Sequence, residues 1–202
     1  MRNVRPNCLF AVAVLASALA PVAARADDAL TVTSAQVTVN CPLTIGGSFD
    51  AKTSALTGTI TPDSSGAVKG TFAVDLIKLE TGISLRDRHL RNNYLEVQKG
   101  AEFAVAKFDN IKIQKLSGKT TFSGTMTLHG QQHDVSGSAE LQQDGKGYKV
   151  DATFPLKISA FQIPEPTYLG VGVSDEITIH VLLTASPAAA PRATTNGSSG
   201  TR

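Results

Sequence analysis

The sequence predicts an all-β protein, an antiparallel barrel of eight strands with one short helical segment near residues 85–97. Two observations support this fold class. From residue 30 to residue 185, apolar and polar residues alternate in runs rich in β-branched side chains, and glycine-rich breaks separate the runs. Most connections between neighbouring runs are too short to contain a crossover helix, so neighbouring strands should be antiparallel.

Eight runs have the pattern of a strand. Short turns such as Asp63–Gly66 and Asp144–Gly147 join some of the neighbours. Within each run one face is apolar and the other polar, as a closed barrel or a sandwich of two sheets requires. The expected strands cover residues 29–39, 56–63, 68–79, 101–113, 119–130, 133–143, 148–158 and 176–185.

Periodicity alone does not separate a barrel from a sandwich. Eight strands that close on themselves enclose a space that side chains can fill or that can hold one small ligand. The chain has eight Phe and no Trp, and many Ala and Gly stand at facing positions. Because small residues beside Phe leave room, the composition favours a barrel with an internal cavity.

Residues 85–97 break the alternation. Apolar residues stand at positions 85, 90, 94, 95 and 97 with charged residues between them, and there is no β-branched run. This spacing fits a short helix better than a strand. Asp87 near the start supports a helix, whereas the Asn92–Asn93 pair could interrupt it.

The first 26 residues have the features of a secretory signal peptide. Arg2 and Arg5 precede an apolar stretch from Cys8 to Ala20, and Ala24–Ala26 matches the small-x-small cleavage pattern. The apolar stretch is shorter than the ~20 residues that span a bilayer, so no stable membrane span is expected. An uncleaved membrane anchor is the alternative.

Composition then divides the remaining chain. One folded domain is expected over residues 27–185, and a disordered tail rich in Pro, Ala, Gly and Ser over residues 186–202. Cleavage would remove three of the 19 basic residues and leave 16 against 17 acidic residues, a net charge of −1. Because phosphates demand a basic patch, a nucleic-acid partner is not expected.

Cysteine and histidine residues indicate no metal site and no cofactor. Cys41 would be the one thiol of the exported chain, and a lone cysteine is more typical of a small buried hydrophobe than of a reactive group. His129 and His133 are four residues apart, but Gly130 and the flanking strands predict a hairpin turn rather than a helix. Both are expected to be partly exposed turn residues, although Cys41 could in principle complete a site with them.

The sequence also lacks the usual motifs of an enzyme. There is no nucleophile elbow, H-E-x-x-H, phosphate-binding glycine loop or C-x-x-C. No catalytic residues are therefore expected. Two alternatives stay open: an enzyme that acts on a lipid with His89 and Asp87 at the rim of the barrel, and a ligand-free structural or interaction barrel filled by side chains.

Three segments resemble the YceI-like family of secreted bacterial proteins. Residues 81–111 carry R-D-x-H-L at Arg86 to Leu90, residues 122–135 carry L-H-G, and residues 169–185 carry a terminal D-E-I strand. The resemblance implies a lipocalin-like barrel with an elongated apolar cavity that binds a polyisoprenoid or similar amphiphilic chain in the periplasm. The sequence departs from the family at residues 159–173, where a more apolar stretch could reshape the cavity mouth.

The candidate site has an apolar part and a polar part. Burial of hydrocarbon contributes about 0.8 kcal/mol per CH₂ group, so affinity needs no catalytic group. At the rim, Arg86, Arg88 and Arg91 could bind a phosphate or quinone oxygen, while Asp87 or His89 holds one arginine in place. Alternatively, Asp87 and His89 cap the helical turn and tie it to the barrel rim, and the arginines are solvated. The apolar candidates, for which a plain core role is the alternative, are Phe72, Phe103, Phe108, Phe122, Leu128, Phe154, Ile158 and Phe161.

These observations predict a periplasmic or secreted binding protein. It would hold a polyisoprenoid, an isoprenoid quinone or a fatty-acyl amphiphile inside the barrel, for transport, storage or sequestration. A long-chain lipid is therefore the expected partner, and pairing of two barrels as a homodimer is left open.

Overall fold

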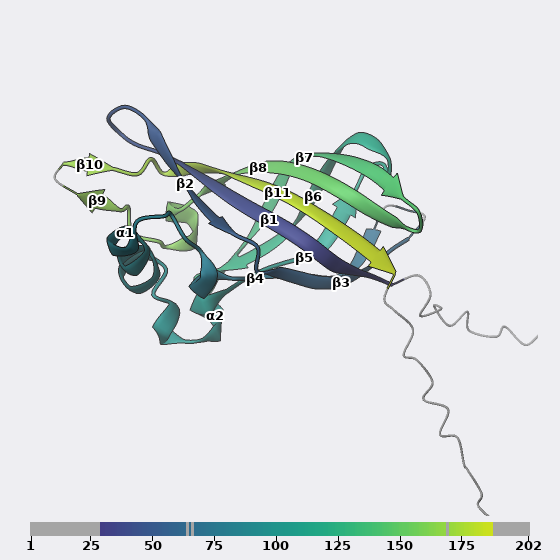
Figure 1. The fold of residues 1–202 in the computed structure, drawn as a ribbon, viewed down its shortest axis with the longest axis horizontal. Helices are drawn as coiled ribbons and strands as arrows, with labels where there is room; N and C mark the ends of the chain where they lie inside the picture. The colour runs from purple at the N-terminus through teal and green to yellow at the C-terminus, as the bar shows by residue number, and fades with distance from the viewer. Residues whose placement is uncertain (1–28, 64, 66, 169, 188–202) are drawn as a thin grey trace, which may run out of the picture.

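The computed structural model describes residues 29–63, 65, 67–168 and 170–187. The expected signal peptide lies outside the described residues, as does the expected tail from residue 188 on. Apart from a separate sheet of two short strands, the described strands form one elongated antiparallel barrel with most of the helical segments gathered at one end (Figure 1). Among the described residues, no helix has the length and apolar character that a bilayer crossing requires.

The barrel wall is one sheet that closes on itself. Its strands follow the order β11-β8-β7-β6-β5-β4-β3-β1-β2, and β1 pairs with β11 to close the ring. The strand bounds are β1 Leu30–Pro42, β2 Ser48–Thr53, β3 Leu56–Pro62, β4 Ala67–Asp75, β5 Val105–Ile113, β6 Gly118–Leu128, β7 Gln131–Asp144, β8 Gly147–Lys157 and β11 Glu176–Pro187.

Strands β2 and β3 together occupy a single position in the ring. Residues 37–42 of β1 pair with β2, and residues 30–31 of β1 pair with β3, so one interrupted strand lies along β1. The barrel is therefore eight-stranded, which confirms the predicted fold class. Each expected strand overlaps an observed one, and β11 continues to Pro187, two positions into the expected tail.

Three parts of the predicted secondary structure are wrong. Strand β2 was not expected, because its only apolar residues are Phe49 and Ala51. The end of the expected strand 68–79 is instead a 3₁₀ turn, η2 (Leu76–Lys78), because the Asp75 carboxylate accepts a hydrogen bond from the backbone N–H of Ile77. The start of the expected strand 101–113 is the short helix α2 (Ala101–Ala104).

The predicted helical segment is confirmed as a series of short helical turns. Helix α1 (Ser84–His89) continues into a π-helical turn, η3 (Leu90–Tyr94), and a 3₁₀ turn, η4 (Val97–Lys99), follows. Glu96 separates the last two turns with a left-handed backbone, φ 49°. These turns and α2 make up the connection between β4 and β5.

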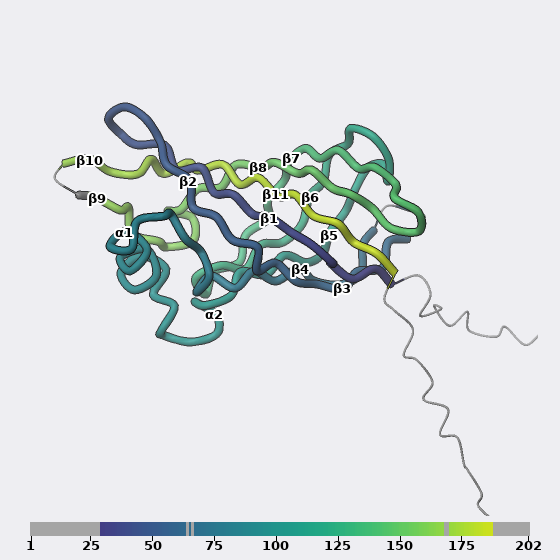
Figure 2. The backbone as a smooth tube through the Cα atoms, viewed as in Figure 1, coloured from purple at the N-terminus to yellow at the C-terminus, as the bar shows by residue number. Residues whose placement is uncertain are grey.

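The two ends of the barrel are built differently (Figure 2). We call one the helical end, formed by residues 76–104 and by residues 158–175, which contain η5 (Ser159–Phe161), β9 (Thr167–Tyr168) and β10 (Val171–Gly172). The β1–β2 and β6–β7 turns lie at the same end. We call the other the turn end, where short turns join β3 to β4, β5 to β6 and β7 to β8.

The buried core divides between these two ends. The larger cluster lies at the helical end and includes Leu95, Leu156 and Phe161, and the smaller one lies toward the turn end and includes Leu30, Leu183 and Ala185. Phe122, Val181 and other partly buried residues lie between the ends. The middle of the barrel is thus less completely filled than the helical end.

Candidate functional site

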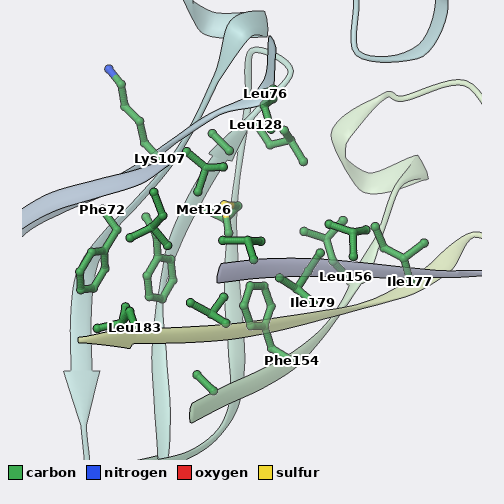
Figure 3. Close-up of a pocket in the computed structure, with 18 of the residues that line it drawn as sticks. Phe72, Leu76, Lys107, Met126, Leu128, Phe154, Leu156, Ile177, Ile179 and Leu183 are labelled. Atoms are coloured by element: carbon green, nitrogen blue, oxygen red, sulfur yellow. The ribbon is translucent and has the colours of Figure 1, made fainter. Parts of the chain in front are cut away.

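An apolar cavity of about 260 Å³ lies inside the barrel. Side chains from all the strands of the ring contribute to its wall, and the surface that faces it is apolar. Figure 3 shows Phe72, Met126 and Phe154, which come from three different strands, around one shared space, while the amine of Lys107 points away from it. The expectation of a barrel with a cavity is therefore confirmed.

Glycines in the wall explain why phenylalanine rings do not fill the barrel. A Cβ atom built on Gly58 would lie 2.9 Å from the ring of Phe72, and one on Gly124 would lie 2.5 Å from the ring of Phe108. Each ring therefore lies close against the backbone of the neighbouring strand, in space that any other residue would occupy. The phenyl groups line the wall and leave the axis of the barrel open.

Gly137 has the same role at the centre of the barrel. It lies on β7, between Phe122 on β6 and Phe154 on β8, and a Cβ there would lie 3.0 Å from the Phe122 ring and 2.6 Å from Cβ of Phe154. The two rings meet edge to face across this gap with centroids 5.9 Å apart, and Phe122 meets Phe108 in the same way at 6.0 Å. Such geometry is favourable for aromatic pairs.

Most of the apolar candidates line the cavity. Phe154 and Ile158 are buried, whereas Phe72 and Phe122 are half-buried because part of their surface faces the cavity. The candidates in the cavity wall are Phe72, Phe108, Phe122, Leu128, Phe154 and Ile158.

Phe103 and Phe161 do not belong to the cavity wall. Phe103 is in α2 rather than in a strand, and its ring packs edge to face against His129 with centroids 4.8 Å apart. Phe161 is 2% exposed in η5, with its ring 5.0 Å from that of His133. Each ring packs on a histidine at or next to the β6–β7 turn. The two rings therefore support the helical end of the barrel without facing the cavity.

The helical end adds cavity residues that sequence reasoning missed. Leu90, Tyr94 and Leu95 from the helical segment face the cavity, as do Ile163 and Val173 from the connection between β8 and β11. The sequence signal was the apolar spacing at positions 90, 94 and 95, which identified the helical face without placing it against the barrel.

Asp87 holds the helical segment together instead of facing the cavity. Its carboxylate accepts hydrogen bonds from the backbone N–H and the hydroxyl of Thr81, both at 2.6 Å, and the residue is 7% exposed. Burial raises the pKa of Asp87, but the two bonds from Thr81 and the charges of Arg91 and Arg86 outweigh burial and lower the pKa below its usual value. This arrangement corresponds to the alternative in which Asp87 secures the turn.

The arginines of the motif have separate roles. Arg86 lies over the ring of Phe49, 4.2 Å from its centroid, and Phe49 lines the cavity. Arg91 donates to the backbone carbonyls of Ile77 and Leu79 at 3.1 and 3.4 Å. Arg88 is exposed. Of the polar candidates Arg86, Asp87 and His89, none belongs to the cavity wall, and Arg86 reaches it through Phe49.

Cys41 lies in the cavity wall as a protonated thiol. It is half-buried on β1, and burial is the main cause that raises its pKa to about 11. The negative charge of Asp50 raises the pKa further, and Arg86 partly opposes the change. Since the thiolate is the nucleophilic form, Cys41 at neutral pH acts as an apolar wall residue.

His129 corrects the expectation of two partly exposed turn histidines. It is 7% exposed, its backbone has φ 53°, and its Nδ1 lies 3.1 Å from the carbonyl oxygen of Phe161, to which it donates. Its Nε2 lies 3.3 Å from the Glu96 carboxylate without hydrogen-bond geometry. His133 is exposed, as expected. Within the described residues, no three His, Cys, Asp or Glu side chains gather as metal ligands would.

The site as a whole suits burial of hydrocarbon. Its wall contains side chains of Leu, Ile, Val, Phe and Met. Of the nearby charged residues, Lys107 turns its amine away from the cavity, Asp87 secures the helical segment and Arg86 lies over an aromatic ring. A ligand held there would gain affinity from the apolar surface it removes from water.

Comparison with known proteins was made on the sequence and on the fold. The family model described as the YceI-like domain matches residues 26–185. No curated protein sequence matches this chain.

Two solved structures share the fold. BcnA of Burkholderia cenocepacia has 18% sequence identity and a TM-score of 0.64, over 75% of this chain and 96% of that one. A polyisoprenoid binding domain from Saccharophagus degradans, implicated in plant cell wall breakdown, has 13% identity and a TM-score of 0.58, over 79% of this chain and 98% of that one. At these identities the likeness shows a common barrel architecture.

Proposed function

This chain belongs to the YceI-like family, and we propose that it is a binding protein that holds one long apolar chain inside its barrel. The ligand is a polyisoprenoid, an isoprenoid quinone or a fatty-acyl amphiphile. The observation that carries this proposal is the apolar cavity, which Gly58, Gly124 and Gly137 keep open by giving the phenyl rings room against the wall.

The size and chemistry of the cavity support this ligand class. A volume of about 260 Å³ is close to the lower limit of small-molecule sites, which begin at about 300 Å³, and its surface is apolar. At about 0.8 kcal/mol per CH₂ group, two isoprene units would contribute several kcal/mol before the cost of association. The description of the Saccharophagus protein as a polyisoprenoid binding domain agrees with this class.

The place of action that we propose is outside the cytoplasm, in the periplasm or in the medium. Support comes from the signal-peptide pattern of residues 1–26. The protein would carry, store or sequester its ligand there. We propose no catalytic step, because the Cys41 thiol is protonated and the Asp87 carboxylate is engaged by Thr81.

Arg86 is the residue that we propose for the polar head of the ligand. Its guanidinium lies on a ring of the cavity wall, and a planar group with five donors suits a phosphate or a quinone oxygen. Asp87 orients the same helix through Thr81. His89 is half-buried one turn after Leu85 in α1 and is a secondary candidate for the same head group.

The first experiment identifies the ligand. Protein purified from its own host is analysed by native mass spectrometry and by solvent extraction. The expected result is one co-purifying lipid of defined mass. Protein that is bare in several independent preparations, and that also fails to bind added prenols and fatty acids, would contradict the proposal and favour a ligand-free barrel.

The second experiment tests the head-group contact. Arg86→Ala and Arg88→Ala are compared for binding of an isoprenoid phosphate and of the matching isoprenoid alcohol. Arg86→Ala should reduce the preference for the phosphate and leave the fold intact, while Arg88→Ala should behave like the parent. Equal binding of both ligands by all three proteins would show that Arg86 does not contact the head group.

A further inference from the structure

Exposed apolar side chains occur in the segments that form the helical end. Five large hydrophobic residues are strongly exposed among the described residues, and four of them are at least 50% exposed: Ile77, Ile83 and Leu85 in residues 76–104 and Ile45 in the β1–β2 turn. Three of these lie within nine positions of the chain. The fifth, Leu182, is 41% exposed on the outside of β11. Single exposed hydrophobes are ordinary, but a group of them indicates a binding surface.

The same part of the chain has an excess of positive charge. Its Asp87 carboxylate is buried against Thr81, which reduces the negative charge offered to solvent. The excess is confined to this stretch, because residues 76–104 and 158–175 together have five Lys and Arg and six Asp and Glu. The charged residues of the stretch 76–91 are the basic Lys78, Arg86, Arg88 and Arg91 and the acidic Glu80 and Asp87.

This stretch has two faces. Leu76, Leu79 and Leu90 line the cavity, whereas the apolar residues named above point to solvent. In α1, Leu85 and Arg88 are three residues apart and therefore share one face, so an exposed apolar group and an exposed cation lie side by side. Residues 76–91 are thus a thin wall between the cavity and the outside.

The stretch lies outside the continuous strand ladder. One backbone bridge pairs its Glu80 with Lys52 of β2, the bonds of Arg91 and Asp87 are made within the stretch, and its Leu76 and Leu79 are buried in the core. The described chain begins and ends at the opposite end, where Leu30 pairs with Pro187. Displacing residues 76–91 would open the cavity without unpairing the ring of strands.

We propose that the helical end docks on a bilayer surface that contains anionic phospholipids, and that the bound chain passes between cavity and bilayer through the wall formed by residues 76–91. The exposed isoleucine and leucine side chains enter the interface between headgroups and acyl chains, and the exposed Arg88 meets the lipid phosphates. Docking on a bilayer is an addition to the proposed function. The passage of ligand rests on the proposed function as well as on the docking.

Vesicle flotation tests the docking. The purified protein is mixed with vesicles of phosphatidylcholine alone or of phosphatidylcholine with phosphatidylglycerol, at low and high salt. The parent should float with the anionic vesicles and less with the neutral ones, and salt should weaken the binding. The double variant Ile83→Ser, Leu85→Ser should lower the partition coefficient about tenfold, and Arg88→Glu about fivefold or more.

Two matched controls separate docking from general effects. Leu182→Ser removes an equally large exposed side chain from the barrel wall, and Lys146→Glu reverses a charge in the turn between β7 and β8. Both should bind vesicles like the parent. All variants should keep the parent's melting temperature and its uptake of a fluorescent prenol in solution.

The outcomes distinguish docking from ligand binding. No flotation of the parent, or equal flotation of all variants, overturns the docking even when the cavity takes up prenol. A dimer that Ile83→Ser, Leu85→Ser disrupts, without vesicle binding, assigns the face to a second copy and also overturns it. A parent that floats but takes up no prenol supports the docking and contradicts the proposed function instead.

Discussion

The helical end and the middle of the barrel contain the same kinds of apolar residue but pack them differently. At the helical end Leu156 and Ile158 are 4% and 5% exposed, because the turns of residues 76–104 and 158–175 cover them. Two residues further along β11 than the buried Ile177, Ile179 is half-buried and faces the cavity. Helical turns pack against the inward side chains at one end of the barrel. Among the described residues, no helical turn packs in the same way against the side chains in the middle.

This difference divides the cavity wall itself, because the buried Leu156, Ile158 and Ile177 line the cavity together with the half-buried Ile179. Close packing at the helical end makes each side chain there costly to remove, because its neighbours cannot collapse into the gap. In the middle the cavity already exists, so a truncated side chain enlarges an existing space. Stability should therefore depend on the first group and ligand affinity on the second.

The largest effect is expected when a charged side chain replaces a buried residue between the helical end and the middle of the barrel. Phe154→Asp puts a carboxylate with no partner beside Phe122, at a position that is 7% exposed. Truncation of a buried Phe alone costs about 3–5 kcal/mol, and an unpaired charge adds to that. The variant should be unfolded or lose lipid retention, as judged by circular dichroism and ligand extraction. A stable, lipid-binding Phe154→Asp protein would contradict the assignment of the core.

A matched pair on one strand tests the comparison directly. Both side chains line the cavity, but Ile177 is buried at the helical end and Ile179 is half-buried. Ile177→Ala should lower the free energy of unfolding by about 3 kcal/mol, and Ile179→Ala by only about 1 kcal/mol. Urea denaturation measures both. Ile179→Ala should in turn weaken prenol binding more than Ile177→Ala does. Equal losses of stability would mean that the two regions are packed alike.

The glycine that separates the central rings should be the next most sensitive position. Gly137→Ala places a methyl group 2.4 Å from the carbonyl oxygen of Thr153 and against the Phe154 side chain, so the strand or the rings must shift. Overpacking of this kind costs about 1–3 kcal/mol and should also reduce the volume open to ligand. Ser136→Ala, the exposed neighbour, is the control and should leave urea stability and prenol binding unchanged.

Asp87 should contribute a smaller, pH-dependent part of the stability of the helical end. Its pKa is lowered in the folded protein, so its contribution is present above the unfolded pKa, ~4, and is lost as the pH falls below it. Asp87→Asn should therefore lower the free energy of unfolding by about 1 kcal/mol at pH 7, and this difference from the parent should shrink as the pH falls below ~4 and through the lowered pKa of Asp87. A difference that does not change with acidification would contradict an ionised Asp87.

The smallest effect concerns Cys41 in the cavity wall. Because burial raises its pKa to about 11 from 9.0, the folded state favours the neutral thiol; this stabilisation is present below pH 9 and is lost as the pH rises toward 11. Thiol reagents should modify the native protein at pH 8 about a hundredfold more slowly than the urea-unfolded chain. Cys41→Ser should lack the alkaline loss of stability. Rapid modification of native, ligand-free protein would place the thiol outside the wall.

The positions of most strands could be predicted from the sequence alone, because the alternation of apolar and polar residues is a local property of the chain. The inward positions of β8 and β11 could be assigned from the spacing of Phe154, Leu156 and Ile177 alone, and the helical segment from its broken alternation. Strand β2 was missed because a segment with two apolar residues carries too weak a signal.

Tertiary structure decided which apolar residues face the cavity and which only support it. Phe103 and Phe154 both stand in runs that the sequence predicts as strands. Phe103 is in the helix α2 and packs on His129, whereas Phe154 faces Phe122 across a glycine of the strand between them. Likewise His129 is buried by η5, which is distant in sequence. These outcomes depend on the register of strands and on connections far apart in the chain, so no local pattern could contain them.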